Sequence, residues 1–402
     1  MKLIAGGVCA PQGFLAAGIH CGIKKKKKDL ALIYSEVPCK TVAMYTSNRV
    51  KAAPIYVTME HLKDGFAQAI IVNSGNANAC AHKGMENAIR MAESAALNLG
   101  LKTSDLIVAS TGVIGVPLPI EKIEGKMPKL VYKLSKDGGS DAAEAIMTTD
   151  TIKKEYSVSF ELKGKTVNIG GISKGSGMIH PNMATTLSFI TTDVDIDEEL
   201  SEKAFSYCVK KSFNRISVDG DTSTNDMASI MASGLAGNPK IVSEDEDYEM
   251  FVKALLKVCV YLAKQLARDG EGATRLITCT VRNSQTEEKA ETIAKSVITS
   301  SLLKTAIFGA DANWGRVLCA MGYSGVDFDY ENVDIYFGSN SGEIAVCKNG
   351  RGIEFDEILA KRILSEHEID IIIDLKEGED IATAWGCDLS YDYVRINGEY
   401  RT

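Results

Sequence analysis

Short apolar segments of strand length alternate with amphipathic helical segments along the whole 402-residue chain. Residues 69–72 and 106–109 have the composition of buried strands. Between them, apolar residues at three-to-four spacing predict a helix over residues 79–99, which Gly100 ends. A hairpin is expected over residues 156–169. Because hairpins are mixed with helix pairs, the pattern predicts an α+β layered fold and not a regular parallel βαβ series.

The second half of the chain continues this alternation and then becomes richer in strands. Further helices are expected over residues 120–134, 198–211, 248–267, 290–298 and 302–307. Further strands are expected over residues 187–190, 276–281, 333–337, 342–347, 369–374 and 393–396. A chain of this length exceeds what one hydrophobic core usually supports, so two lobes are expected.

The composition narrows the classes of function. Hydrophobic residues make up 45% and charged residues 24%, as in an ordinary soluble protein, and the formal charge of −8 argues against a nucleic-acid partner. The basic run Lys24–Lys28 is expected to be a solvated turn between strands. No apolar run reaches the roughly 20 residues of a membrane span. Ten cysteines without metal-ligand spacing predict no metal site and favour a reducing cytoplasm.

A glycine-rich segment, residues 174–187, leads into an apolar strand and contains the sequence Ala184-Thr185. If that peptide bond breaks, Thr185 acquires a free α-amine with a pKa of about 8, which can take the proton of its own hydroxyl. The residues alone leave two alternatives open. The segment can be the ordinary start of a strand, since threonine favours strands, and Thr186 could serve as well as Thr185.

Five further positions carry groups suited to a reaction at that threonine. Thr111 and Gly112 follow a strand and could stabilise an oxyanion, although a tight turn is the simpler interpretation. Lys174 could hold a substrate carboxylate or remain solvated. Thr148 could equally be a helix cap, and Glu271 a solvated carboxylate.

Sequence motifs distributed over the whole chain resemble those of the ornithine acetyltransferases, the bifunctional enzymes of arginine biosynthesis. The matching segments, in the family's order, are residues 13–18, 46–54, 73–78, 110–115, 147–151, 174–187, 219–226, 269–274, 309–316 and 396–397. Members of this family split themselves at an Ala–Thr bond. Thr186 is a mild departure, because the family often has methionine there.

The resemblance implies a role for each candidate residue. The cleavage site is Ala184–Thr185, and Thr185 is the catalytic nucleophile. Thr111 and Gly112 form the oxyanion hole. The substrate-binding residues are implied to be Thr148, Lys174, Thr185, Glu271, Asn397 and Thr402, the last resting on alignment at a chain end.

The resemblance also implies the reaction. Thr185 takes acetyl from N2-acetylornithine and passes it to glutamate, without a cofactor; some relatives also accept acetyl-CoA. The enzyme would be a glutamate N-acetyltransferase. A threonine aminopeptidase or amidohydrolase of similar N-terminal-nucleophile chemistry is the alternative, and a non-catalytic binding protein a further one.

The implied fold is a layered α/β/β/α-type sandwich of the self-cleaving N-terminal-nucleophile kind, with a strand-rich C-terminal lobe. Residues 1–184 would form the α chain, with the oxyanion hole. Residues 185–402 would form the β chain, with the C-terminal lobe at about 281–402. The fragments are expected to assemble as an α2β2 heterotetramer in the cytoplasm, without a nucleic-acid or membrane partner.

Overall fold

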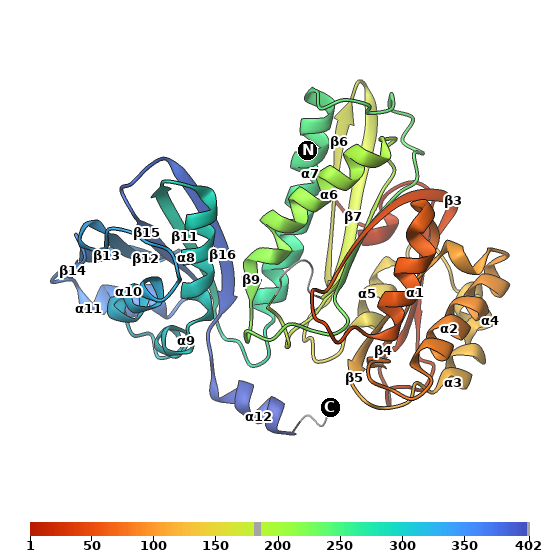
Figure 1. Ribbon diagram of the computed structural model, residues 1–402, viewed down its shortest axis with the longest axis horizontal. Helices are drawn as coiled ribbons and strands as arrows, with labels where there is room; N and C mark the ends of the chain where they lie inside the picture. The colour runs from red at the N-terminus through yellow and green to blue at the C-terminus, as the bar shows by residue number, and fades with distance from the viewer. Residues whose placement is uncertain (181–185, 400–402) are drawn as a thin grey trace.

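Two β-sheets with helices packed against them form the computed structural model, which describes residues 1–180 and 186–399 (Figure 1). The first sheet has nine strands and belongs to the larger lobe. The second has seven strands, most of which come from the C-terminal part of the chain. The expected α+β class and the strand-rich C-terminal lobe are confirmed.

The first sheet has the strand order β1-β6-β7-β8-β10-β3-β4-β5, with β2 paired to β3. Its strands are β1 (Lys2–Ile4), β2 (Phe14–Ile19), β3 (Leu30–Tyr45), β4 (Phe66–Asn76), β5 (Leu106–Val113), β6 (Lys154–Leu162), β7 (Lys165–Lys174), β8 (Leu187–Thr192) and β10 (Met227–Ala232). Most pairs are antiparallel, but β4 is parallel to β5 and β8 is parallel to β10.

Helices cover both faces of this sheet. They are α1 (Ala53–His61), α2 (Gly84–Leu99), α3 (Ile120–Glu124), α4 (Met127–Tyr132), α5 (Gly139–Ile146), α6 (Glu198–Lys211) and α7 (Glu246–Arg268). Side chains alternate between the two faces, as the two-residue period of a strand requires. In β4, Ile70 packs in the same core as α5, whereas Ile71 packs with α2 on the opposite face. In β8, Phe189 packs in the core of α5, whereas Ile190 packs with α6 and α7 on the opposite face.

The second sheet has the strand order β14-β13-β12-β15-β11-β16-β9. Its strands are β9 (Ile216–Ser217), β11 (Leu276–Ser284), β12 (Asp334–Ser339), β13 (Gly342–Lys348), β14 (Arg351–Gly352), β15 (Glu368–Asp374) and β16 (Asp380–Cys387). The remaining helices are α8 (Glu287–Thr299), α9 (Ser301–Phe308), α10 (Trp314–Gly322), α11 (Glu357–Leu364) and α12 (Tyr391–Glu399). Helix α12 leaves this lobe and extends below α7 toward the larger lobe (Figure 1).

Helix α7 connects the core of the larger lobe to the candidate site. Asp245 caps its first turn by accepting hydrogen bonds from the amides of Asp247 and Tyr248. Its apolar face is buried against β6 and β7. Because the helix ends at Arg268, the next residues, Asp269 and Glu271, are placed beside the end of β7.

Two sequence expectations about local structure are wrong. The helix expected over residues 120–134 is two short helices, α3 and α4, separated at Gly125. The strand expected over residues 393–396 is part of helix α12. Its β-branched and aromatic residues favour a strand, but a hydrogen bond from the Asp392 amide to the Ser390 hydroxyl caps the first turn instead.

No helix within the described ranges has both the length and the apolar composition needed to cross a membrane. Eight of the ten cysteines are buried, and all ten are free thiols. The buried ones therefore serve as small apolar core residues.

Candidate active site

Lys174 is the last residue of β7, and its ammonium is buried at the point where β5, β7 and β8 come together. Its side chain is 8% exposed and donates a hydrogen bond to the Thr111 hydroxyl across 3.2 Å. Burial lowers the pKa of Lys174, while the neighbouring Asp150 carboxylate opposes that shift. A buried cation of this kind is suited to holding an anionic group that enters from outside.

Gly112 follows Thr111 where β5 runs beside β4. Its φ angle of +132° lies in a region that side chains disfavour. A Cβ atom there would lie 2.4 Å from the carbonyl carbon of Gly75. Only glycine therefore fits at this position without displacing the backbone of β4.

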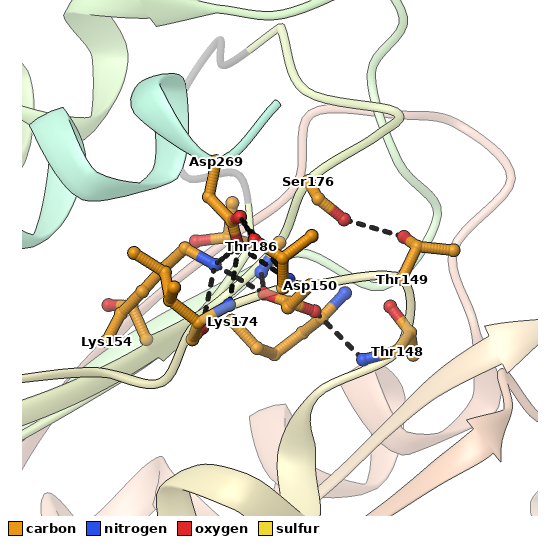
Figure 2. A network of polar contacts seen from close by, with 12 residues as sticks. Thr148, Thr149, Asp150, Lys154, Lys174, Ser176, Thr186 and Asp269 are labelled. Carbon is orange, nitrogen blue, oxygen red and sulfur yellow. Dashed lines mark hydrogen bonds and ion pairs between the residues drawn. The ribbon is translucent and has the colours of Figure 1, made fainter. Parts of the chain in front are cut away.

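Asp150 joins two loops of the site (Figure 2). One carboxylate oxygen accepts hydrogen bonds from the Gly175 amide and from the Lys154 ammonium, each at 2.7 Å. The other accepts the Thr148 amide at 2.8 Å. This carboxylate therefore fixes the loop that carries Thr148 against the glycine turn after Lys174.

Lys154 is fully buried between two carboxylates, those of Asp150 and Asp269. Its ammonium lies 2.6 Å from Asp269, which also accepts the Thr151 amide at 3.0 Å. Burial alone would raise the pKa of Asp150, but Lys154 and Lys174 together hold it well below the usual range. The network ties the end of α7 to the start of β6.

Glu271 lies on the other side of the glycine turn. Its amide donates to the Ser176 carbonyl at 2.8 Å, and its carboxylate accepts a hydrogen bond from the Asn397 side chain at 2.8 Å. The Ser176 hydroxyl is in turn hydrogen-bonded to that of Thr149 at 2.6 Å. Glu271 and Asn397 are thus brought together although they are far apart in sequence.

Thr186 is the first described residue after the sequence Ala184-Thr185. Its φ angle of 98° is rare for a β-branched residue and marks a strained backbone. Its amide donates to one carboxylate oxygen of Asp226 at 2.6 Å. Burial raises the pKa of Asp226 to about 7, against the opposing effects of the Thr186 amide and Lys174.

One cavity is shared by these groups. Its lining includes Thr111, Lys174, Gly175, Thr186 and Asp226. Its volume of about 20 Å³ is roughly that needed for one water molecule. The inner end of the site can therefore hold an atom the size of a single oxygen.

The six predicted site residues that the structure describes lie around one segment, residues 174–177. Thr111 contacts Lys174 directly, Thr148 reaches Gly175 through Asp150, and Glu271 contacts Ser176. Gly112 follows Thr111, and Asn397 contacts Glu271. Ala184, Thr185 and Thr402 lie outside the described residues.

Four buried charged residues of the site were not among the sequence-predicted set: Asp150, Lys154, Asp226 and Asp269. The available signal was that Asp150, Asp226 and Asp269 lie inside the motifs at residues 147–151, 219–226 and 269–274. Asp226 directly precedes the apolar strand β10. Lys154 follows its partner Asp150 by four residues, but its second partner, Asp269, is 115 residues away, so the local sequence does not distinguish Lys154 from a solvated lysine.

The arrangement offers three kinds of group within one site. A buried ammonium can hold a carboxylate, a more exposed carboxylate can hold an ammonium, and a hydroxyl at a strand end can donate to a developing oxyanion. A cation and an anion on opposite sides of a glycine turn suit a zwitterionic amino acid.

Comparison with known proteins identifies the family. A sequence model of the ArgJ family matches residues 15–402. The arginine biosynthesis bifunctional protein ArgJ of Caldanaerobacter subterraneus subsp. tengcongensis is 54% identical over 403 residues, covering 100% of both chains. The Bacillus subtilis protein of that name is 47% identical, covering 99% of this chain and 97% of its own.

Among solved structures, the Bacillus halodurans arginine biosynthesis bifunctional protein argJ is similar to this chain. The two are 48% identical with a TM-score of 0.52, and the match covers 54% of this chain and 100% of that one. The resemblance found in the motifs is thus confirmed over the full length of the sequence. The chain belongs to the ArgJ family, the ornithine acetyltransferases.

Proposed function

We propose that this glutamate N-acetyltransferase works by double displacement through Thr185. The Thr185 α-amine, set free by cleavage after Ala184, takes the proton of the Thr185 hydroxyl. The hydroxyl oxygen attacks the acetyl carbonyl of N2-acetylornithine, and ornithine leaves. Glutamate then enters the same pocket and leaves as N-acetylglutamate. The acetyl group passes from the amine of ornithine to Thr185 and then to the amine of glutamate, and neither transfer needs a cofactor.

Thr111 and Gly112 are proposed to stabilise the oxyanion in each step. A lysine ammonium has only donors, so the Thr111 oxygen must accept in its contact with Lys174. The Thr111 hydroxyl proton therefore remains available for another acceptor. Removing one such donor typically costs about 3 kcal/mol of transition-state stabilisation.

The remaining proposed residues hold the substrate. Lys174 binds the α-carboxylate, which donor and acceptor share. Glu271, oriented by Asn397, attracts an ammonium, and Thr148 is proposed to contact the substrate. Thr402 completes the proposed set. The observation that carries this assignment is the convergence of Thr111, Lys174 and Glu271 on the glycine turn that precedes the proposed cleavage site.

We propose a division of the chain into an α fragment, residues 1–184, and a β fragment, residues 185–402, with residues from about 281 forming the C-terminal lobe. The solved Bacillus halodurans chain matches 54% of this chain over its entire length. That share is close to the share of residues 185–402. The fragments are proposed to assemble as an α2β2 heterotetramer.

Acetyl-CoA is proposed as a second acetyl donor, and the word "bifunctional" in the names of the relatives supports this proposal. The cytoplasm is the proposed compartment. Ten free thiols in the described part of the chain suit a reducing environment.

The decisive experiment combines a denaturing gel, N-terminal sequencing and an acetyl-transfer assay. The purified protein should give two fragments of similar size, one of which begins at Thr185. Release of ornithine from N2-acetylornithine should accelerate when glutamate is added. The Thr185→Ala chain should stay intact and inactive. An intact, active wild-type chain would disprove the cleavage mechanism, and release that ignores glutamate would indicate a hydrolase.

A further inference from the structure

A second pocket, the lysine pocket, lies beside α4 and shares no lining residue with the site cavity. Its volume of about 600 Å³ falls in the range of small-molecule sites. Four lysines line it, and no carboxylate among the described residues does: Lys28, Lys126, Lys129 and Lys133. A chain with a formal charge of −8 thus concentrates positive charge in one hollow.

Three of these lysines share one face of the short helix α4. Lys126, Lys129 and Lys133 follow one another at intervals of three and four residues, and all three are exposed. None of them forms an ion pair with a described residue. Lys28, in contrast, is paired with two carboxylates of α5. Because like charges at this spacing destabilise a helix, three unpaired cations around a hollow favour an anionic ligand.

The loop between β2 and β3, which supplies Lys28, has a conformation fixed by buried Asp29. That carboxylate accepts the amides of Cys21 at 2.5 Å, Gly22 at 3.1 Å and Lys24 at 2.8 Å. The lysines at residues 25–27 are exposed, as expected for this basic run, whereas Lys24 is half-buried. The fold therefore holds further positive charge beside the lysine pocket.

Lys24 joins this loop to the candidate active site. Its ammonium donates to the Lys28 carbonyl at 2.9 Å and to the Met147 carbonyl at 2.5 Å. Lys28 lines the lysine pocket, and Met147 directly precedes Thr148. One ammonium therefore holds an edge of the pocket against the loop that carries Thr148.

The same loop is packed against the strand beside Gly112. Gly75 of β4 is the register partner of Gly112. A Cβ atom on Gly75 would lie 3.0 Å from the side chains of Ile23 and Lys24. This contact is independent of the hydrogen bonds of Lys24, and it also places the edge of the lysine pocket close to proposed site residues.

We propose that the lysine pocket binds the 3′-phosphorylated ADP end of acetyl-CoA. Since acetyl-CoA is the proposed second donor, this assignment rests on the proposed function. The ADP end carries several phosphate groups, and lysines are common phosphate ligands. The pantetheine arm is about as long as the backbone of four residues, roughly 14 Å when extended, so the acetyl thioester can reach along the loop toward Thr148.

The shape and charge of the surface favour a small phosphate ligand over a nucleic acid. A nucleic-acid site normally has an extended basic face, whereas the unpaired lysines described above surround one hollow on a chain of net negative charge. N2-acetylornithine carries no phosphate. The lysine pocket therefore serves only one of the two proposed acetyl donors.

The test compares the two donors on the same enzyme. In the double variant Lys129→Ala/Lys133→Ala, KM for acetyl-CoA should rise at least about tenfold, because contacts between cations and phosphates are lost. Both KM and kcat for N2-acetylornithine should stay those of the wild type. The KM for S-acetylpantetheine, which lacks the nucleotide, should also be the same in the two proteins.

The matched control is Lys253→Ala/Lys257→Ala. These two lysines of α7 are exposed, have the same four-residue spacing and form no ion pair within the described chain, but they do not line the lysine pocket. Any general effect of removing two positive charges should appear equally in both double variants. The control should keep the wild-type KM for acetyl-CoA.

A binding measurement gives a readout that does not depend on turnover. Calorimetric titration of the wild type with adenosine 3′,5′-bisphosphate should show binding that competes with CoA and weakens as the salt concentration rises. The Lys129→Ala/Lys133→Ala variant should lose this binding. Inorganic phosphate at the same concentration should compete poorly, and equal competition would mean that the pocket recognises any phosphate and not the nucleotide of CoA.

Several further results would overturn the assignment. An unchanged KM for acetyl-CoA in the Lys129→Ala/Lys133→Ala variant would exclude these lysines, and an equal rise for both donors would place the effect in the shared site. Wild-type protein that transfers acetyl from N2-acetylornithine but neither binds CoA nor uses acetyl-CoA would refute the lysine pocket alone. Protein that binds the bisphosphate through these lysines, yet neither splits nor transfers acetyl, would instead refute the proposed function.

Discussion

Lys174 donates a hydrogen bond to the Thr111 hydroxyl across 3.2 Å, and both side chains are buried. The contact joins the ends of β5 and β7, which the chain reaches 63 residues apart. Because the ammonium cannot accept, the direction of this hydrogen bond is fixed, and the Thr111 proton points to a different acceptor. The lysine that we propose to attract an anionic substrate thus also orients a hydroxyl donor.

Replacing Thr111 with valine removes the hydroxyl while nearly preserving the shape. We expect kcat for acetyl transfer to fall by about 100-fold, because one oxyanion donor is lost, with a smaller effect on KM. Self-cleavage should slow as well, since it passes through a similar oxyanion. Steady-state kinetics and a time course on denaturing gels measure the two effects. Thr111→Ser, which keeps the hydroxyl, should retain most of the activity; an active valine variant would exclude Thr111 from the oxyanion hole.

Replacing Lys174 with methionine removes the cation but keeps the length of the side chain. We expect KM for N2-acetylornithine and for glutamate to rise at least about tenfold, as loss of a charge-assisted contact predicts. Lys122→Met, at an exposed lysine that donates a hydrogen bond to the Gly22 carbonyl, is the control and should leave both KM values unchanged.

The pH dependence of KM provides an independent check on Lys174. Burial lowers the pKa of Lys174 below that of an ordinary lysine, so the cation is lost at a lower pH than in a solvated lysine. In the wild type, KM should therefore rise as the pH increases through this lowered pKa. In Lys174→Met this rise should be missing, and its persistence there would assign the effect to another group.

Alanine variants of Gly112 and Gly115, which both have positive φ angles, separate the effect of steric crowding from that of backbone strain. Gly112→Ala would place a Cβ atom 2.4 Å from the Gly75 carbonyl carbon, so β4 and β5 must separate. Gly115, with a φ angle of +80°, has no atom within 4 Å of its virtual Cβ. We expect Gly112→Ala to lose both self-cleavage and turnover, while Gly115→Ala shows only a modest loss of stability. Thermal unfolding and activity of the two variants, measured in parallel, test this; equal effects would refute it.

The sequence predicted the polar residues at the ends of strands better than it predicted the buried charged residues of the site. Strands 69–72 and 106–109 were evident from their apolar runs, and the motifs after them placed Thr111 and Gly112 correctly at the end of β5. Lys154 was not recognisable, because its partner Asp269 is 115 residues away in sequence. Pairing of that kind depends on the tertiary fold and leaves no local pattern.

At helix α12 a local sequence pattern was present but predicted the wrong structure. Tyr393, Val394 and Ile396 have high strand propensity, and their sequence predicted a strand. The structure places them in a helix whose Asn397 contacts Glu271. A strand there would need a neighbouring edge to pair with, whereas a short helix satisfies its own backbone. Tertiary context therefore overrides propensity at the C-terminal end of the described chain.

Replacing Lys154 with methionine should destabilise the fold strongly at neutral pH. The ammonium is fully buried between Asp150 and Asp269, and its removal leaves two buried carboxylates without their common cation. Breaking a buried pair in this way typically costs about 3–5 kcal/mol of unfolding free energy. Urea denaturation at pH 7 measures the loss. Lys203→Met, which breaks the exposed pair with Glu244, should leave the midpoint unchanged.

The pH dependence of the same measurement tests the mechanism. Lys154 and Lys174 hold the pKa of Asp150 below its usual range in the folded state. The ionised carboxylate therefore stabilises the wild type above the unfolded-state pKa of about 4, and this contribution is lost as the pH falls through the folded-state pKa. In Lys154→Met the folded-state pKa of Asp150 rises, so the stability difference between the two proteins should shrink on acidification below about pH 4. A difference that stays constant between pH 7 and pH 3 would mean that lost packing of the lysine side chain, and not its charge, accounts for the destabilisation.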